Sequence, residues 1–225
     1  MVWELPAGSH LFRARACRSF SIKDAYKEPL RYVGPPPSAQ ARVGRMNVEG
    51  VAIFYGATDC ETCLAEVRPA LGNEVVVIEV QTAKPLRVLD FTRLEESYSQ
   101  LSYFQPDFNE QAEKGVFLRR LQRLISQPVV SGRETDYLIT QIMMEYLAHV
   151  HDKPFDGILF RSVQRAEGVN AVLFPDPTGA FPIGYVDKSF KLFTTTSIKY
   201  THREEDVGLT DDGEIWVHTE TYDDS

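Results

Sequence analysis

With 225 residues and an apolar fraction of 43%, the chain has the size and composition of one large globular domain with a sizeable core. Its net charge of −8 argues against non-specific nucleic-acid binding, which needs a basic footprint, so we expect no direct nucleic-acid partner. Three cysteines, an odd number, argue against a disulfide framework and favour a reduced, cytoplasmic setting. We expect no membrane partner, because no window approaches the ~18 apolar residues of a span and the first residues lack the pattern of a secretion signal.

The N-terminal part of the chain predicts a strand over residues 11–15. The side chains of Arg13 and Arg15 would share one face of this strand, because residues two apart in a strand point the same way. If that face is buried, two arginines on it require an anionic partner. The proline-rich residues 34–37 then form a stiff loop that leads to Arg45.

The stretch from 44 to 68 is the most informative part of the chain, and it predicts a loop, a strand and a capped helix. Residues 51–55 are a short apolar run between glycines, so we expect a strand that ends at Tyr55. Glu66 would lie about two helical turns further on. Together with Arg45, these residues place a cation, an aromatic ring and a carboxylate beside one turn. That set suits an anionic ligand that carries a flat, cationic ring.

The start of this helix has two candidate caps, Thr58 and Asp59. Thr58 with Glu61 also fits a capping box, in which each side chain binds the other residue's backbone amide. The helix should end near Pro69 or Gly72.

The remaining elements alternate between strands and helices. We expect strands over 74–80, 86–90 (extending or pairing with the strand before it), 157–160, 171–174, 197–202 and 214–221, and helices over 110–125 and 137–149. The core face of the second helix should comprise Ile142, Met143, Tyr146 and Leu147. Aromatic residues in 181–185 and 190–193 suit a sheet edge or a dimer face. With no regular βαβ series and no glycine-rich phosphate loop, the pattern predicts a mixed fold with flanking helices rather than a Rossmann fold.

Four blocks of the sequence, in order and spacing, resemble the RES domain family. They are Phe12-Arg13-Ala14-Arg15; Gly44-Arg45-Met46-Asn47 with Phe54-Tyr55; Thr62 to Val67; and Phe155 to Ser162 with Asn170 to Phe174. The blocks cover residues 11–175, and we treat 1–225 as a single domain with a C-terminal extension of strands and an acidic tail. The resemblance implies an α+β, ADP-ribosyltransferase-like fold with mixed, largely antiparallel sheets.

The resemblance also implies a function. RES-domain proteins supply the toxin of RES–Xre toxin–antitoxin pairs and act on NAD⁺, which they phosphorolyse or hydrolyse, or from which they transfer ADP-ribose to a protein. We therefore expect NAD⁺ as a substrate rather than a cofactor, an Xre-type antitoxin as a partner, and a homodimer.

The family match assigns catalytic roles to Glu66, Arg45, Tyr55 and Ser162. Glu66 can stabilise the positive charge that develops on the ribose when nicotinamide leaves. Arg45 can donate two hydrogen bonds to a phosphate, and Tyr55 can stack on nicotinamide or bond the ribose. Ser162 would hold the ribose or orient Glu66. The expected NAD⁺-binding residues are Arg45, Tyr55, Arg13, Arg15 and Asn170, of which Asn170 has a more structural role in the preceding turn.

Two other readings stay open. Cys60 and Cys63 form a CxxC pair at the start of a helix, as in thioredoxin-like redox proteins, but the flanking context of that motif is missing. A zinc site would need two more ligands, so we expect no metal. The chain could also be a RES-fold module that binds an ADP-ribose-like ligand without turnover. The retention of four residues together favours the enzyme: Arg45, Tyr55, Glu66 and Ser162.

Overall fold

The computed structural model describes residues 1–98, 104, 106–126, 137–199, 205–210 and 212–218. The chain divides into two compact units, Met1–Thr195 and Thr196–Ser225. All of the site residues expected from the sequence lie in the first unit. That both units form a single domain stays a prediction.

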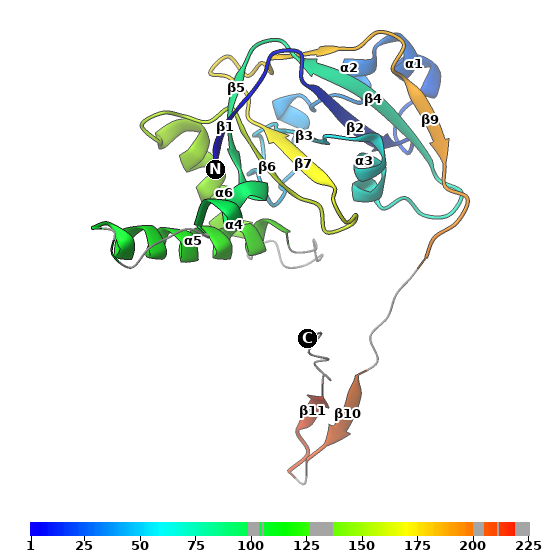
Figure 1. The fold of residues 1–225 in the computed structure, drawn as a ribbon. Helices are drawn as coiled ribbons and strands as arrows, with labels where there is room; N and C mark the ends of the chain where they lie inside the picture. The colour runs from blue at the N-terminus through cyan, green and yellow to red at the C-terminus, as the bar shows by residue number, and fades with distance from the viewer. Residues whose placement is uncertain (99–103, 105, 127–136, 200–204, 211, 219–225) are drawn as a thin grey trace. The chain divides into compact units, whose positions relative to one another are not determined.

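The first unit is built on a nine-stranded mixed sheet (Figure 1). Its strands are β1 (Val2–Leu5), β2 (His10–Ala16), β3 (Phe54–Ala57), β4 (Glu74–Thr82), β5 (Leu86–Asp90), β6 (Gly157–Arg161), β7 (Val169–Leu173), β8 (Ile183–Tyr185) and β9 (Lys191–Thr194). The strand order is β1-β5-β6-β7-β3-β2-β4-β8, and β9 pairs with the other end of β4. Within the described residues, β5 and β6 run parallel and the other neighbours in the sheet run antiparallel.

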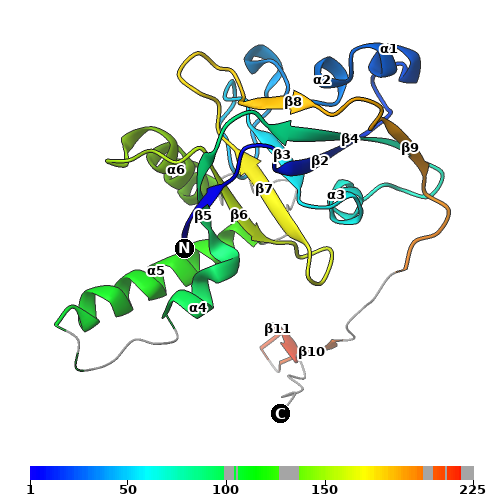
Figure 2. The ribbon, with the colours of Figure 1, turned by 45° about the horizontal axis from the view of Figure 1, so that its top comes forward.

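Helices flank this sheet (Figure 2). They are α1 (Ile22–Lys27), α2 (Pro29–Tyr32), α3 (Cys60–Val67), α4 (Leu94–Tyr98), α5 (Phe108–Ser126) and α6 (Leu138–Glu145), which continues as a π-helical turn over Tyr146–Val150. The predicted α+β class, with a mixed and largely antiparallel sheet, is confirmed. None of the helices in the described residues is both long and apolar enough to cross a bilayer.

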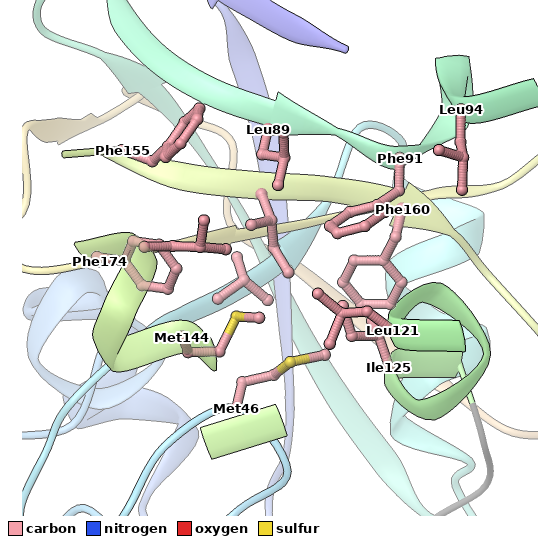
Figure 3. Packing of buried hydrophobic residues seen from close by; sticks show 13 residues of the cluster. Met46, Leu89, Phe91, Leu94, Leu121, Ile125, Met144, Phe155, Phe160 and Phe174 are labelled. Atoms are coloured by element: carbon pink, nitrogen blue, oxygen red, sulfur yellow. The ribbon is translucent and has the colours of Figure 1, made fainter. Parts of the chain in front are cut away.

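The two faces of the sheet carry two separate hydrophobic clusters, because neighbouring residues of a strand point to opposite sides. In β6, Ile158 and Phe160 join one cluster, whereas Leu159 joins the other. The first cluster packs the sheet against α4, α5 and α6, and the second packs it against α1 and α2 (Figures 2 and 3). Met46, from the loop that carries Arg45, points into the first cluster beside Met144 (Figure 3).

Two strand predictions are corrected by the structure. Residues 51–53 lie outside any strand, and β3 begins at Phe54, so Tyr55 is its second residue and not its last. β5 neither extends nor pairs with β4; it pairs with β1 and, in parallel, with β6. The parallel partner comes from residues that follow α6 in the chain, which local patterns cannot reveal.

The core face of α6 also differs from the prediction. Leu147 is buried as expected, but Ile142 and Tyr146 are 57% and 42% exposed. The polar residues Thr140 and Gln141 are buried in their place, since both donate hydrogen bonds to backbone carbonyls of the 44–47 loop. Hydrogen bonding to that loop therefore sets the rotation of the helix, against its apolar pattern.

The second unit contains an antiparallel hairpin of β10 (Asp206–Leu209) and β11 (Ile215–His218). The predicted strand over 214–221 is confirmed for Ile215–His218, whereas 219–221 lie outside the described residues. Of the strand predicted over 197–202, residues 197–199 are not in a strand and 200–202 are not described. The strand β10 was not predicted; its Gly208 lies under the indole of Trp216, where a Cβ would come within 2.4 Å of the ring.

Candidate functional site

The helix α3 carries Glu66 and is fixed at both ends. Asp59 is its N-cap and accepts a hydrogen bond of 2.8 Å from the amide of Thr62, so Asp59 rather than Thr58 is the cap. Arg68 ends the helix in the left-handed conformation, with φ at 47°. Glu66 is thus the last residue but one of an eight-residue helix with defined ends.

The carboxylate of Glu66 accepts two hydrogen bonds, one from the residue that follows β6 and one from a residue of β7. The hydroxyl of Ser162, which directly follows β6, donates to Oε1 over 2.6 Å. The amide Nδ2 of Asn170, in β7, donates to the same oxygen over 2.7 Å. Bonds from neutral donors to an ionised carboxylate are short and strong, so this carboxylate is held in one orientation. Asn170 does not fix a turn, as the sequence suggests, but contacts Glu66 directly.

Tyr55 stands beside this carboxylate. Its ring packs edge-on against Phe160, with centroids 6.2 Å apart and planes at 73°. Burial and the negative charge of Glu66 raise the pKa of the Tyr55 phenol, against the opposing effect of the positive charges of Arg45 and Arg68. The phenol therefore stays protonated at neutral pH and acts as a hydrogen-bond donor rather than a base.

The side chain of Arg45 is anchored at one end only. Its Nη1 donates to the carbonyl of Ile125, at the end of α5, over 2.6 Å, and its guanidinium carbon lies 5.6 Å from the ring centre of Tyr137. Its Nε and Nη2 are buried and have no hydrogen-bond partner among the described residues. Unpaired donors of a buried cation are costly, so this end of the guanidinium is suited to an anionic ligand.

Asn47 and Gln141 shape the loop that presents Arg45. The amide of Asn47 donates to the carbonyls of Arg42, Val48 and Val51 at 2.9, 3.1 and 2.9 Å. Gln141 donates to the carbonyl of Gly44 over 2.7 Å. The sequence does not point to Gln141, because a glutamine inside an amphipathic helix carries no signal of a distant backbone partner.

A cavity of about 420 Å³ opens between this loop and the end of α3. Its charged lining residues are Arg13, Arg42, Arg45, Arg68 and Glu66. A smaller space of about 60 Å³ adjoins it and shares Arg45, Tyr55, Glu66 and Arg68. Four arginines around one carboxylate suit a ligand with several negative charges and one positive centre.

The two arginines of β2 have different surroundings. Arg13 lines the cavity while donating to the carbonyls of Val33 and Tyr55 over 2.7 and 2.6 Å. Burial lowers its pKa to about 10, so the side chain is still a cation at neutral pH. Arg15 donates to the carbonyl of Tyr32 and does not line the cavity. The structure therefore brings Arg13 to the site and leaves Arg15 outside it.

Arg42 and Arg68 also line the cavity, and the sequence alone does not single them out. Arg42 lies in an irregular loop, and Arg68 looks like the end of a surface helix. The one available signal was their closeness in sequence to Arg45 and Glu66.

The thiols of the CxxC pair have raised pKa values, whereas the cysteines of redox sites have lowered ones. Cys60 and Cys63 are free thiols in α3, and burial raises the pKa of both, that of Cys63 to about 12. Reactive cysteines need a lowered pKa, so these thiols are poor nucleophiles. No three His, Cys, Asp or Glu side chains are grouped for metal binding in the part of the chain that the structure describes.

Comparison with models of protein families identifies a family for this chain. The sequence model of the RES domain fits residues 10–192, which include β2 to β8 and every residue that lines the cavity. A search of curated proteins finds no match to the chain. Because the fitted residues make up most of its 225, the chain belongs to the RES domain family.

Proposed function

We propose that this RES-type, toxin-like protein binds NAD⁺ and breaks the bond between nicotinamide and ribose. The observation that carries the proposal is the position of the Glu66 carboxylate. It is fixed by Ser162 and Asn170 at the edge of a cavity that Arg45 also lines, and two buried donors of Arg45 have no partner among the described residues. NAD⁺ combines the two features that this arrangement suits, a pyrophosphate and a cationic ring on a ribose.

In the proposed reaction, the C–N bond to nicotinamide breaks and its electron pair leaves with the ring, which becomes neutral. The ribose carbon passes through an oxocarbenium-like state, and the Glu66 carboxylate stabilises the developing positive charge. An oxygen of phosphate or water then bonds to that carbon, and a water nucleophile releases one proton to the solvent. The protein is thus an NAD⁺ phosphorylase or glycohydrolase.

The other side chains bind and orient the substrate. Arg45 would donate Nε and Nη2 to the pyrophosphate, with Arg13 and Arg68 adding positive charge in the same cavity. Tyr55 would hold the ring or the ribose while donating to Glu66, because its raised pKa keeps the phenol protonated.

From the family we further propose a cytoplasmic protein that forms a homodimer and is neutralised by an Xre-type antitoxin. An antitoxin would act by covering the cavity. Transfer of ADP-ribose to a protein side chain uses the same bond cleavage with another acceptor, and ligand binding without turnover uses the same cavity. Both are outcomes of the experiment that follows.

The test is to incubate purified protein with NAD⁺, with and without phosphate, and to identify the products by mass. Phosphate-dependent formation of ADP-ribose-1″-phosphate indicates a phosphorylase, and phosphate-independent ADP-ribose indicates a glycohydrolase. Glu66→Gln, which keeps the shape of the side chain, should abolish either activity. No loss of NAD⁺ with the wild-type protein would reject the degradation reading and favour transfer to an acceptor or binding alone.

A further inference from the structure

The loop of residues 162–168, which joins β6 to β7, orients the hydroxyl that contacts Glu66. Its ends are tied by a bond of 2.8 Å from the amide of Ser162 to the carbonyl of Gly168. The Ser162 oxygen accepts from the amides of Gln164 and Arg165 at 3.1 and 3.3 Å. Since a hydroxyl oxygen has two lone pairs, these bonds leave its proton to point at Glu66.

The side chain of Arg165 joins this loop to the first turn of α3. Nη1 lies 3.2 Å from Asp59 Oδ1 and 3.2 Å from Thr62 Oγ1, and Nη2 lies 2.7 Å from Glu61 Oε2. Burial acts to raise the pKa of Asp59, but hydrogen bonds from Thr62 and the charge of Arg165 bring it below its ordinary value. One guanidinium therefore binds two carboxylates and a hydroxyl at the N-terminus of the helix that carries Glu66.

The backbone packs closely at the same place. A Cβ on Gly168 would lie 2.5 Å from Oγ1 of Thr62, which is fully buried. The loop and the helix start are thus in direct contact, and a shift of one displaces the other. Ser162 and Glu66 lie on these two segments.

We propose that Arg165 is a positioning residue, which holds the Ser162 hydroxyl on Glu66 by locking the 162–168 loop to α3. The inference rests on the proposed function. It assigns to Arg165 no contact with substrate, because its partners lie at the opposite end of α3 from Glu66. The step it affects is the bond cleavage and not the binding of NAD⁺.

The first test is the kinetics of Arg165→Ala. We expect kcat to fall about tenfold with KM for NAD⁺ within twofold of wild type, since displacements of ~1 Å at a reacting group cost up to 10²-fold. Arg31→Ala is the matched control, because it also removes an arginine side chain, one that is exposed, pairs with Glu28 and lies outside the 162–168 loop. Its kcat should equal that of the wild type.

The second test separates positioning from general damage to the fold. If Arg165 acts through Ser162, the double variant Arg165→Ala, Ser162→Ala should have the kcat of Ser162→Ala alone. If the kcat losses of the two single variants multiply in the double variant, the inference is overturned. A rise in KM with unchanged kcat in Arg165→Ala would also overturn it. Arg165→Lys keeps the positive charge at this position and should give a kcat between those of the wild type and Arg165→Ala. If Arg165→Ala does not fold, Arg165→Lys takes its place in the comparison with Ser162→Ala.

These outcomes are distinguishable from failure of the proposed function. If the wild-type protein does not consume NAD⁺, the proposed function fails and the inference fails with it. If the wild-type protein turns NAD⁺ over and Glu66→Gln does not, the proposed function stands. Unchanged kcat in Arg165→Ala would then reject the positioning role alone.

Discussion

The two charged halves of the cavity are built in opposite ways. On one side, the carboxylate of Glu66 is held by Ser162 and Asn170 on a helix with defined ends. On the other side, the guanidinium of Arg45 is held through Nη1 and keeps two buried donors unpaired among the described residues. The carboxylate itself is already hydrogen-bonded, although Asn170 Oδ1 behind it has no partner among the described residues, whereas the guanidinium keeps two of its own donors unpaired.

This difference indicates different roles. A side chain whose bonds are already made costs no rearrangement when charge develops beside it, which is the property of a group that stabilises a transition state. A buried cation with unpaired donors gains most when a ligand fills them, which is the property of a binding group. Glu66 should therefore control the rate, and Arg45 the affinity.

The largest effect is expected for Glu66→Gln. Removing the negative charge while keeping the shape should lower kcat by ~10²-fold or more, the scale of a lost electrostatic stabiliser. Steady-state kinetics measure this, with circular dichroism to show that the variant is folded. Turnover of the variant at the wild-type rate would show that Glu66 takes no part in the mechanism and does not control kcat.

Arg45→Ala should have the next largest effect and act on binding. Loss of a charged, two-donor contact should weaken NAD⁺ binding by about 2 kcal/mol, or roughly thirtyfold. Calorimetric titration in the Glu66→Gln background avoids turnover during the measurement. Arg31→Ala, which removes an exposed arginine that pairs with Glu28, controls for the change in net charge. Equal affinities of the two arginine variants would argue against a phosphate contact at Arg45.

Asp59→Ala should destabilise the protein, because it removes the N-cap of α3, the helix that carries Glu66. Loss of an N-cap costs about 1 kcal/mol in the free energy of unfolding, measured by urea denaturation. Because the folded pKa of Asp59 lies below its ordinary 3.8, its ionised form adds stability above that pH, and this stability is lost as the pH falls through the folded pKa. Asp59→Asn keeps the cap and should lose only the part of the stability that depends on pH. A cap contribution of zero would mean that α3 is held by its packing alone.

The smallest effect is expected for the double change Cys60→Ser, Cys63→Ser. Both thiols have raised pKa values, so they take no part in the proposed chemistry. NAD⁺ consumption should be unchanged in the folded variant. If the folded variant no longer consumed NAD⁺, a redox or metal-binding role for the two cysteines would be favoured. The proposal that α3 serves to carry Glu66 would then be weakened.

Much of the fold and of the site could be predicted from local pattern and family resemblance. The strands β2, β4, β6 and β7 and the helix α5 follow from apolar runs, and residues of the four family blocks line either the cavity or the smaller space beside it. What could not be predicted depends on partners far apart in the chain. The rotation of α6 follows from the bonds that Thr140 and Gln141 make to the 44–47 loop, and the parallel pairing of β5 with β6 joins segments separated by α4 to α6.

The same limit applies to individual side chains of the site. Arg13 and Arg15 are equivalent by spacing, yet of the two only Arg13 lines the cavity. Arg13 donates to the carbonyls of Val33 and of Tyr55 in β3, whereas Arg15 donates to the carbonyl of Tyr32 in α2. Asn170 and Arg165 gain their roles through contacts with α3, about 100 positions away in the sequence. No periodicity or motif indicates such contacts.

The most direct test of the contrast between Glu66 and Arg45 is to measure kcat and the dissociation constant for NAD⁺ in both variants side by side. The account predicts that Glu66→Gln binds NAD⁺ as the wild-type protein does but does not turn it over. Arg45→Ala should bind weakly yet approach the wild-type kcat at saturating NAD⁺. Weakened binding in Glu66→Gln with full affinity in Arg45→Ala would contradict the account.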